Sequence, residues 1–218
     1  MPRSLNSYQL KLLAALLMVI DHVGVVFFPG VEVLRFIGRF SFPLFCWLLV
    51  QGEAHTRNFW AYLIRLLIMG IITQPIYNTV LLNGANDQYN ILFTLAIGLV
   101  CLRIARFNRW LQIPAWIAGA ALAQVIPVDY SYYGIAIIAL IRYFEPTGLW
   151  WTAWLLIHFA LVLAEPGWGI SQAPAIAAPV FFMLANGERG KRARWFYWFY
   201  PGHIAVLFVI QHLIPRVS

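Results

Sequence analysis

Charged residues are scarce in this sequence: Asp, Glu, Lys and Arg make up 11% of its 218 residues, whereas hydrophobic residues make up 62%. A soluble domain carries roughly a quarter of its residues as charges, because its surface must be wetted by water. The deficit excludes an ordinary soluble globular domain. It indicates that most of the molecular surface faces hydrocarbon.

Cysteine and the common catalytic motifs are also missing or nearly so. The two cysteines, Cys46 and Cys101, both lie in apolar runs, so neither a disulfide framework nor a thiolate metal cluster is expected. The sequence contains no glycine-rich nucleotide-binding loop, no His/Cys/Glu metal-ligand spacing and no Gly-x-Ser-x-Gly elbow. We therefore expect no bound metal, and the local motifs leave the chemistry open.

Long apolar runs are what the sequence has in abundance. Runs of roughly 18–22 residues recur along the chain, and that length crosses about 30 Å of hydrocarbon. They are uniformly apolar, which favours helices over the alternating strands of a β-barrel. We expect an all-α, polytopic membrane helix bundle that fills residues 1–218 as a single domain. Its nine spans are predicted at residues 8–28, 33–52, 60–82, 90–106, 110–127, 130–145, 147–164, 173–187 and 196–214.

The distribution of basic residues predicts the orientation. Positive residues in short loops stay in the cytoplasm, so the net charge of +7 is a topology signal and no nucleic-acid partner is expected. The N-terminus is therefore expected in the cytoplasm, with the acidic loops outside. The first run is expected to remain as a span, because it is long for a signal peptide and lacks a small-residue cleavage site.

The first span carries three polar residues within "LKLLAALLMVIDHVGVVFFPG". Lys11 and His22 are eleven residues apart, which is three helical turns plus about 20°, so they share a face about 16 Å apart along the axis. Charged and imidazole groups at this depth usually face the bundle interior and mark a site. The alternative is that Lys11 snorkels to the interface and His22 is a satisfied interior residue.

Asp21 points about 100° away from His22 and needs a partner on another span. Arg35 and Arg39 lie four residues apart in "LRFIGRFSFPLF" and share a face. Arg39, one turn deeper, is the expected partner of Asp21 or a group that stabilises an oxyanion. Arg35 suits a substrate contact or an interfacial anchor. Pro43 is expected to kink this span.

Further basic residues predict a cationic rim at the cytoplasmic ends, which suits a phosphorylated ligand. Arg57 lies in the turn "GEAHTRN", and Arg65 lies two turns deeper on the same face. Arg103 and Arg106 lie at the end of the fourth span. The plainer explanation, a topology signal, holds for most of these residues taken singly, and Arg65 is the least surface-like.

Two motifs are expected at the ends of later spans, one at the outer mouth of the sixth span and one at the opening of the last span. Asp129 and Tyr130 lie in "DYSYYG", and Tyr200 and His203 lie in "FYWFYPGH". We expect these four residues to contact a substrate, with an aromatic interface belt as the alternative for the tyrosines. His158 and His212, each alone in an apolar helix, are expected to be polar core residues.

Seven motifs stand in order along the chain: "MVIDHVG", "LRFIGRFSFPLF", "GEAHTRN", "YLIRLL", "NILFTL", "DYSYYG" and "FYWFYPGH". In their order and spacing they resemble the TraX family of bacterial membrane proteins, named for the conjugative-pilin acetylase that acetylates the N-terminus of pilin. A looser similarity is to the membrane acyltransferase-3 superfamily, whose first span carries a basic residue, ten intervening residues and a histidine. Lys11 and His22 have this spacing, with Lys in place of the usual Arg.

The resemblance implies a transmembrane acetyltransferase in the bacterial inner membrane, surrounded by membrane lipids. Acetyl-CoA would enter from the cytoplasm, with its phosphates on the cationic rim and Lys11 and its thioester beside His22. His22 would act as general base or accept the acetyl group transiently. For Asp21 we expect a role in charge balance, and for Arg39 the stabilisation of the oxyanion. The implied acceptor is a pilin-like protein, a glycan or a lipid at the outer face.

Two other functions stay open at this point. A transporter or flippase would use Asp21, His22 and Arg39 as a proton or anion relay, although no paired half-repeats are visible. A non-catalytic assembly factor for a surface polymer would need none of these groups to react.

Overall fold

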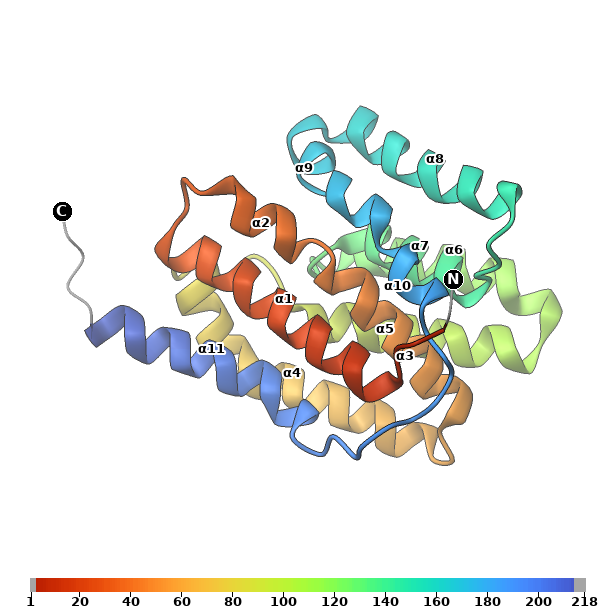
Figure 1. Ribbon diagram of the computed structural model, residues 1–218, viewed down its shortest axis with the longest axis horizontal. Helices are drawn as coiled ribbons and strands as arrows, with labels where there is room; N and C mark the ends of the chain where they lie inside the picture. Colours follow the sequence, from red (N-terminus) through yellow and green to blue (C-terminus); the bar gives the residue numbers. More distant parts are fainter. Residues whose placement is uncertain (1–2, 214–218) are drawn as a thin grey trace.

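The computed structural model describes residues 3–213, and within that range every regular element is a helix. The β-type pairings there are two isolated bridges, between Leu5 and Ala185 and between Tyr89 and Val128. The all-α prediction is confirmed. In chain order (Figure 1) the elements are α1 Ser7–Phe27, α2 Glu32–Gly38, α3 Ser41–His55, α4 Phe59–Leu81, α5 Ile91–Phe107, η1 Arg109–Leu111, α6 Gln112–Val125, α7 Ser131–Arg142, α8 Gly148–Ala164, α9 Pro166–Ser171, η2 Ala173–Ala177, α10 Pro179–Met183 and α11 Phe196–Leu213.

Three stretches of the described chain are long and apolar enough to cross a membrane: Ser7–Phe27, Glu32–His55 and Phe59–Leu81. They match the first three predicted spans and indicate a membrane protein. The number of nine spans and the cytoplasmic N-terminus stay predictions. Residue 214, the last of the final predicted span, lies outside the described residues.

Helix breaks account for the main differences from the predicted spans. The second span is divided between α2 and α3 at Arg39 and Phe40, before Pro43, and not at the proline itself. Pro43 is the third residue of α3, where a missing backbone N–H leaves no helical hydrogen bond unmade. The predicted span at 173–187 is instead the short pair η2 and α10. Pro174 is the second residue of η2 and Pro179 is the first residue of α10, positions in the first turn where proline is tolerated.

Helix α1 positions the site, and its start is fixed by local chemistry. Asn6 and Gln9 form a reciprocal capping box: the Gln9 backbone N–H donates to the Asn6 side chain at 3.0 Å, and the Asn6 backbone N–H donates to the Gln9 side chain at 2.9 Å. The cap sets the phase of the helix and so the direction of Lys11 and His22. The helix packs against α2, α3 and α11.

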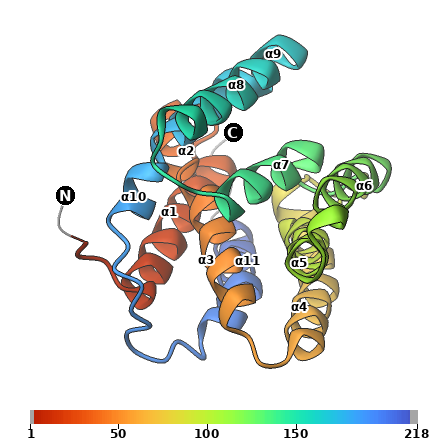
Figure 2. The same ribbon diagram turned by 90° about the vertical axis from the view of Figure 1, so that its right-hand side faces the viewer.

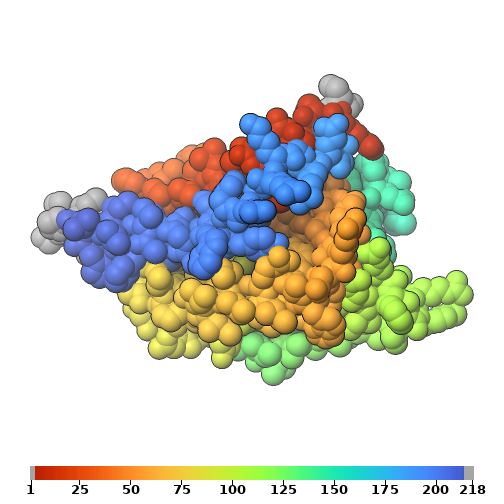
Figure 3. Space-filling model, turned by 90° about the horizontal axis from the view of Figure 1, so that it is seen from below, coloured from red at the N-terminus to blue at the C-terminus, as the bar shows by residue number. Residues whose placement is uncertain are grey.

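The segment before α1 pairs with the segment that follows α10. The backbone N–H groups of Ser4 and Leu5 each donate to the Leu184 carbonyl at 2.9 Å, and Asn186 returns a bond to the Leu5 carbonyl at 2.9 Å. From there the chain runs to α11, which packs against both α1 and α4. Figure 3 shows α11 and the segment before it beside α4.

The remaining helices form a second part of the bundle. Helix α5 packs against α4, α6 and α7, and α8 with α9 stands as an outer layer (Figure 2). Both cysteines are free and buried, with Cys46 on α3 at 0% exposure and Cys101 on α5 at 4%. Their burial agrees with the apolar runs in which the sequence places them.

Candidate functional site

A cavity of about 1360 Å³ runs alongside α1. Ser7 and Lys11 line it at one end of the helix, and Asp21 and His22 line it at the other. The helical rise separates the Lys11 and His22 positions by about 16 Å. The two residues therefore share one wall, as their spacing predicts. Helices α2, α3, α4 and α11 supply other parts of the lining.

His22 is in contact with a second histidine. Its Nδ1 lies 2.8 Å from Nε2 of His203 on α11, and the ring centroids are 5.0 Å apart with the planes 14° from parallel. His203 Nδ1 in turn lies 2.8 Å from the Phe199 carbonyl oxygen. His203 was expected to contact a substrate, but it does not line the cavity and contacts His22 instead.

Asp21 is paired with Arg35 and not with Arg39, which corrects the expected pairing. An Nη1–Oδ2 distance of 2.8 Å joins Arg35 to Asp21. The reason is the close approach of α1 and α2 at Gly38, where a Cβ would lie 2.2 Å from the Asp21 Cβ. This contact brings Arg35, three residues before Gly38, over the carboxylate.

Arg39 lies at the end of α2 and points into the cavity from a buried position, with 7% of its surface exposed. Its Nη1 donates to the Tyr130 hydroxyl at 3.2 Å. Its buried Nε has no hydrogen-bond partner among the described residues. A buried guanidinium with an unused donor favours an anionic or carbonyl oxygen in the cavity.

The turn before α7 holds two consecutive residues with positive φ, Tyr130 at 63° and Ser131 at 41°. Residues with side chains rarely adopt this conformation, and it persists where surrounding contacts impose it. The Tyr130 ring stacks on Phe42 at a centroid distance of 3.8 Å, and the Thr94 hydroxyl donates to the Asp129 carbonyl. These contacts hold Asp129 and Tyr130 in the lining of the cavity.

Asp129 has an altered acidity. Burial raises the pKa of its carboxyl to about 6, and the nearby Arg39 guanidinium opposes part of that rise. The carboxyl therefore changes its charge within a pH range that solution experiments can reach. Tyr200, another predicted substrate contact, also lines the cavity.

Cations gather at the other end of the cavity. Lys11 Nζ lies 5.6 Å from the centre of the Phe196 ring, and the Arg65 guanidinium lies 5.0 Å from that of Tyr197. These aromatic residues begin α11, so three separate parts of the chain meet here. The four cations that line this end of the cavity, the cationic mouth, are Lys11, Arg57, Arg65 and Arg189.

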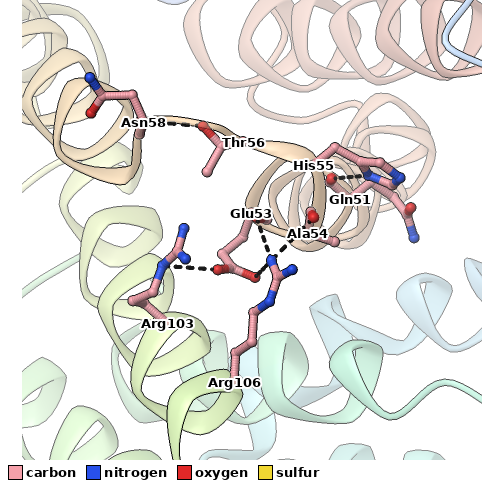
Figure 4. A network of polar contacts seen from close by, with 8 residues as sticks. All are labelled: Gln51, Glu53, Ala54, His55, Thr56, Asn58, Arg103 and Arg106. Carbon is pink, nitrogen blue, oxygen red and sulfur yellow. Dashed lines mark hydrogen bonds and ion pairs between the residues drawn. The ribbon is translucent and has the colours of Figure 1, made fainter.

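Two members of the predicted cationic rim, Arg103 and Arg106, do not line the cavity. They surround Glu53 of α3, a carboxylate with 2% exposure, in an arrangement that we call the Glu53 clamp (Figure 4). Arg103 Nε lies 3.1 Å from Glu53 Oε1 and Arg106 Nη1 lies 3.6 Å from Oε2. Arg106 also donates to the Ala54 carbonyl at 3.1 Å. The clamp ties α5 to the end of α3.

The expected core position is confirmed for His158 and wrong for His212, which is exposed on α11. His158 is buried between the Tyr133 hydroxyl, 3.1 Å from its Nε2, and the Trp154 carbonyl, 2.8 Å from its Nδ1, so it is a satisfied core residue as expected. Arg189 was missing from the predicted site. Its only sequence signal was its place in the basic run "ERGKRAR", which reads equally well as a topology signal.

Comparisons with known proteins agree with one another. A family model described as "TraX protein" matches residues 6–211 of the chain. The "Probable fimbrial assembly protein FimC, serogroup H1" of Dichelobacter nodosus is 31% identical over 229 residues, covering 93% of this chain and 94% of that protein. The "Uncharacterized protein RP591" of Rickettsia prowazekii (strain Madrid E) is 34% identical over 95 residues, covering 43% of this chain and 36% of that protein. No solved structure matches the chain.

Proposed function

The chain belongs to the TraX family, and from this premise we propose that it is a membrane acetyltransferase that moves an acetyl group from acetyl-CoA to an amine acceptor. The proposed enzyme lies in the bacterial inner membrane with its cationic mouth in the cytoplasm. The acceptor reaches the His22 end from the outer face.

The observation that carries the proposal is the single cavity that joins the cationic mouth to His22. Acetyl-CoA has phosphates at one end and a thioester at the end of an extended arm. Four cations suit the phosphates, because charge-assisted hydrogen bonds from guanidinium and ammonium groups are the strong ones. Apolar residues such as Met18, Phe45 and Leu48 line the cavity and suit the arm. The distance of about 16 Å from Lys11 to His22 suits its length.

The chemical step needs one base. The acceptor amine attacks the thioester carbonyl carbon, so a C–N bond forms and the carbonyl oxygen takes up negative charge. His22 removes the proton from the nitrogen. The C–S bond then breaks, the carbonyl re-forms, and the proton passes from His22 to the sulfur, so that CoA leaves as the thiol. Transient acetylation of the His22 imidazole, followed by transfer to the amine, gives the same overall balance.

Arg39 is the proposed partner of the developing oxyanion. Its Nε is buried and has no hydrogen-bond partner within residues 3–213, and groups fixed in advance where charge develops contribute the largest catalytic effects. Asp21, already neutralised by Arg35 at 2.8 Å, is assigned to charge balance around His22. Asp129, Tyr130 and Tyr200 are assigned to the acceptor, and an ammonium group suits the carboxylate of Asp129.

The acceptor class comes from the relatives. One similar protein is described as a fimbrial assembly protein, so we propose the N-terminus of a pilin-like protein. A glycan or lipid amine or hydroxyl at the outer face would react by the same steps.

Purified protein in proteoliposomes provides the test. His22→Ala should reduce transfer of radiolabelled acetyl from acetyl-CoA to a pilin peptide by about 10²–10⁴-fold, the usual contribution of a general base. His212→Ala is the matched control, because that histidine is exposed and lies outside the cavity lining. Thermal stabilisation by acetyl-CoA and by CoA, but not by acetate, tests donor binding separately. No stabilisation by either CoA form, or full transfer by His22→Ala, contradicts the proposal.

The main competing function is transport, which the extension of one cavity along α1 also favours. A transporter or flippase would give solute or proton flux in the same liposomes without acetyl-CoA. A non-catalytic assembly factor would give neither flux nor transfer, and pilus assembly would survive His22→Ala.

A further inference from the structure

We propose that His203 is a positioning residue that fixes the tautomer of His22, so that Nε2 of His22 carries the free lone pair. The functional consequence rests on the proposed acetyl transfer. The tautomer itself follows from the hydrogen bonds and is measured without any substrate.

The first step of the argument concerns His203 alone. Its Nδ1 lies 2.8 Å from the carbonyl oxygen of Phe199, four residues earlier on α11. A carbonyl oxygen only accepts hydrogen bonds, so Nδ1 of His203 carries the hydrogen. A neutral imidazole has one N–H, and Nε2 of His203 is therefore an acceptor.

The second step concerns the hydrogen bond between His203 and His22 on α1. Nε2 of His203 lies 2.8 Å from Nδ1 of His22, and this contact links residues 181 positions apart in the sequence. Since the His203 nitrogen accepts, Nδ1 of His22 must donate. The remaining nitrogen of His22, Nε2, then has a free lone pair. None of the hydrogen bonds in the described residues uses it.

The third step concerns the rigidity of the pair. The His203 ring stacks on Phe199 at a centroid distance of 4.8 Å and is tilted against Tyr200 at 5.6 Å. These contacts limit rotation of the ring that accepts from His22. Which nitrogen of a histidine is basic is set by the bond that the other nitrogen makes, and a fixed partner therefore fixes the base.

The fourth step assigns the role. His22 lines the cavity, whereas His203 does not and lies behind it. His203 therefore acts through His22 and touches neither acceptor nor donor. Its loss should lower kcat with little effect on the KM for acetyl-CoA. Partners of this kind typically contribute about 10–100-fold.

Two variants distinguish the effect of the hydrogen-bond acceptor at position 203 from the effect of its aromatic ring. His203→Phe keeps an aromatic ring beside Phe199 but cannot accept from Nδ1 of His22. His203→Gln keeps an acceptor oxygen at similar reach. We expect His203→Phe to lower kcat about 10–100-fold and His203→Gln to restore most of it. Thermal unfolding of both variants checks that the bundle is intact.

Nitrogen NMR of ¹⁵N-histidine-labelled protein in detergent reads the tautomer directly, with His22→Gln assigning the His22 signals. The wild type should show His22 protonated at Nδ1, and His203→Phe should shift it toward Nε2 protonation. Wild-type His22 protonated at Nε2, or a tautomer unchanged in His203→Phe, overturns the inference. Absence of acetyl transfer in every variant, with the expected tautomer in the wild type, instead defeats only the proposed function. If His203→Phe does not fold, the wild-type spectrum still decides.

Discussion

Replacing Gly38 by alanine should damage the site without touching a reactive group. The added Cβ would lie 2.2 Å from the Cβ of Asp21, 2.4 Å from its Oδ1 and 2.7 Å from its Cα. Two of these atoms belong to the rigid part of α1, so rotation of the carboxylate does not relieve the overlap. Helices α1 and α2 must move apart instead.

The size of the movement sets the expected effect. Carbon atoms approach to about 3.5 Å, so α2 must retreat by roughly an ångström at this position. That lengthens the 2.8 Å contact between Arg35 and Asp21 and shifts Arg39 in the cavity. Overpacking of this kind costs about 1–3 kcal/mol, which lowers the Tm of a chain of this length by about 2–12 °C. A misplacement of about 1 Å at a reacting centre lowers the rate by up to about 10²-fold.

Thermal unfolding in detergent and acetyl transfer in proteoliposomes are the two assays. Gly202→Ala is the matched control, because it is also a helical glycine, next to His203, and an added Cβ there meets nothing within 4 Å. It should be neutral or stabilising by up to about 1 kcal/mol. Equal Tm values and equal rates for Gly38→Ala and the wild type would refute the close α1–α2 contact and the geometry built on it.

Three further predictions follow from other contacts. Replacing both arginines of the Glu53 clamp by glutamine should destabilise the protein by about 3–5 kcal/mol in denaturant titrations, because the buried carboxylate loses its counter-charges. Glu53→Gln should cost less, because the arginines that it frees reach water. The pKa of Asp129 is raised to about 6 in the folded state, against about 4 in an unfolded chain. The folded state therefore binds more protons than the unfolded state between these values, and the free energy of unfolding falls as pH rises from about 4 to 6. Asp129→Asn should remove that fall in a series of Tm measurements. Arg189→Gln should raise the KM for acetyl-CoA, whereas Lys191→Gln in the same loop, outside the cavity lining, should not.

Local periodicity made the first part of the site predictable. The relation between Lys11 and His22 depends only on 100° per residue within one helix, and the capped α1 preserves it. The composition likewise predicted the helical, apolar character of the chain, since a sequence that is 62% hydrophobic has too few polar residues to cover the water-exposed surface of a globular domain.

The errors arose where two helices meet. Arg35 and Arg39 share a face, and the choice between them as the partner of Asp21 depends on the height at which Gly38 meets α1, which no single-helix pattern encodes. The His22–His203 contact joins distant parts of the chain. Arg103 was assigned to the rim because the burial of Glu53 is a tertiary property.

The two cysteines offer a practical consequence. Cys46 and Cys101 are buried at 0% and 4% exposure, so water-soluble maleimides should not reach them in the folded protein. A cysteine introduced at Arg57 or Asp87, which are exposed before and after α4, would then be the single reactive thiol. Labelling of intact cells and of inverted vesicles with an impermeant reagent would assign each end of α4 to its compartment. The native chain can thus be used without removing its cysteines for topology mapping and for attaching spin labels or fluorophores.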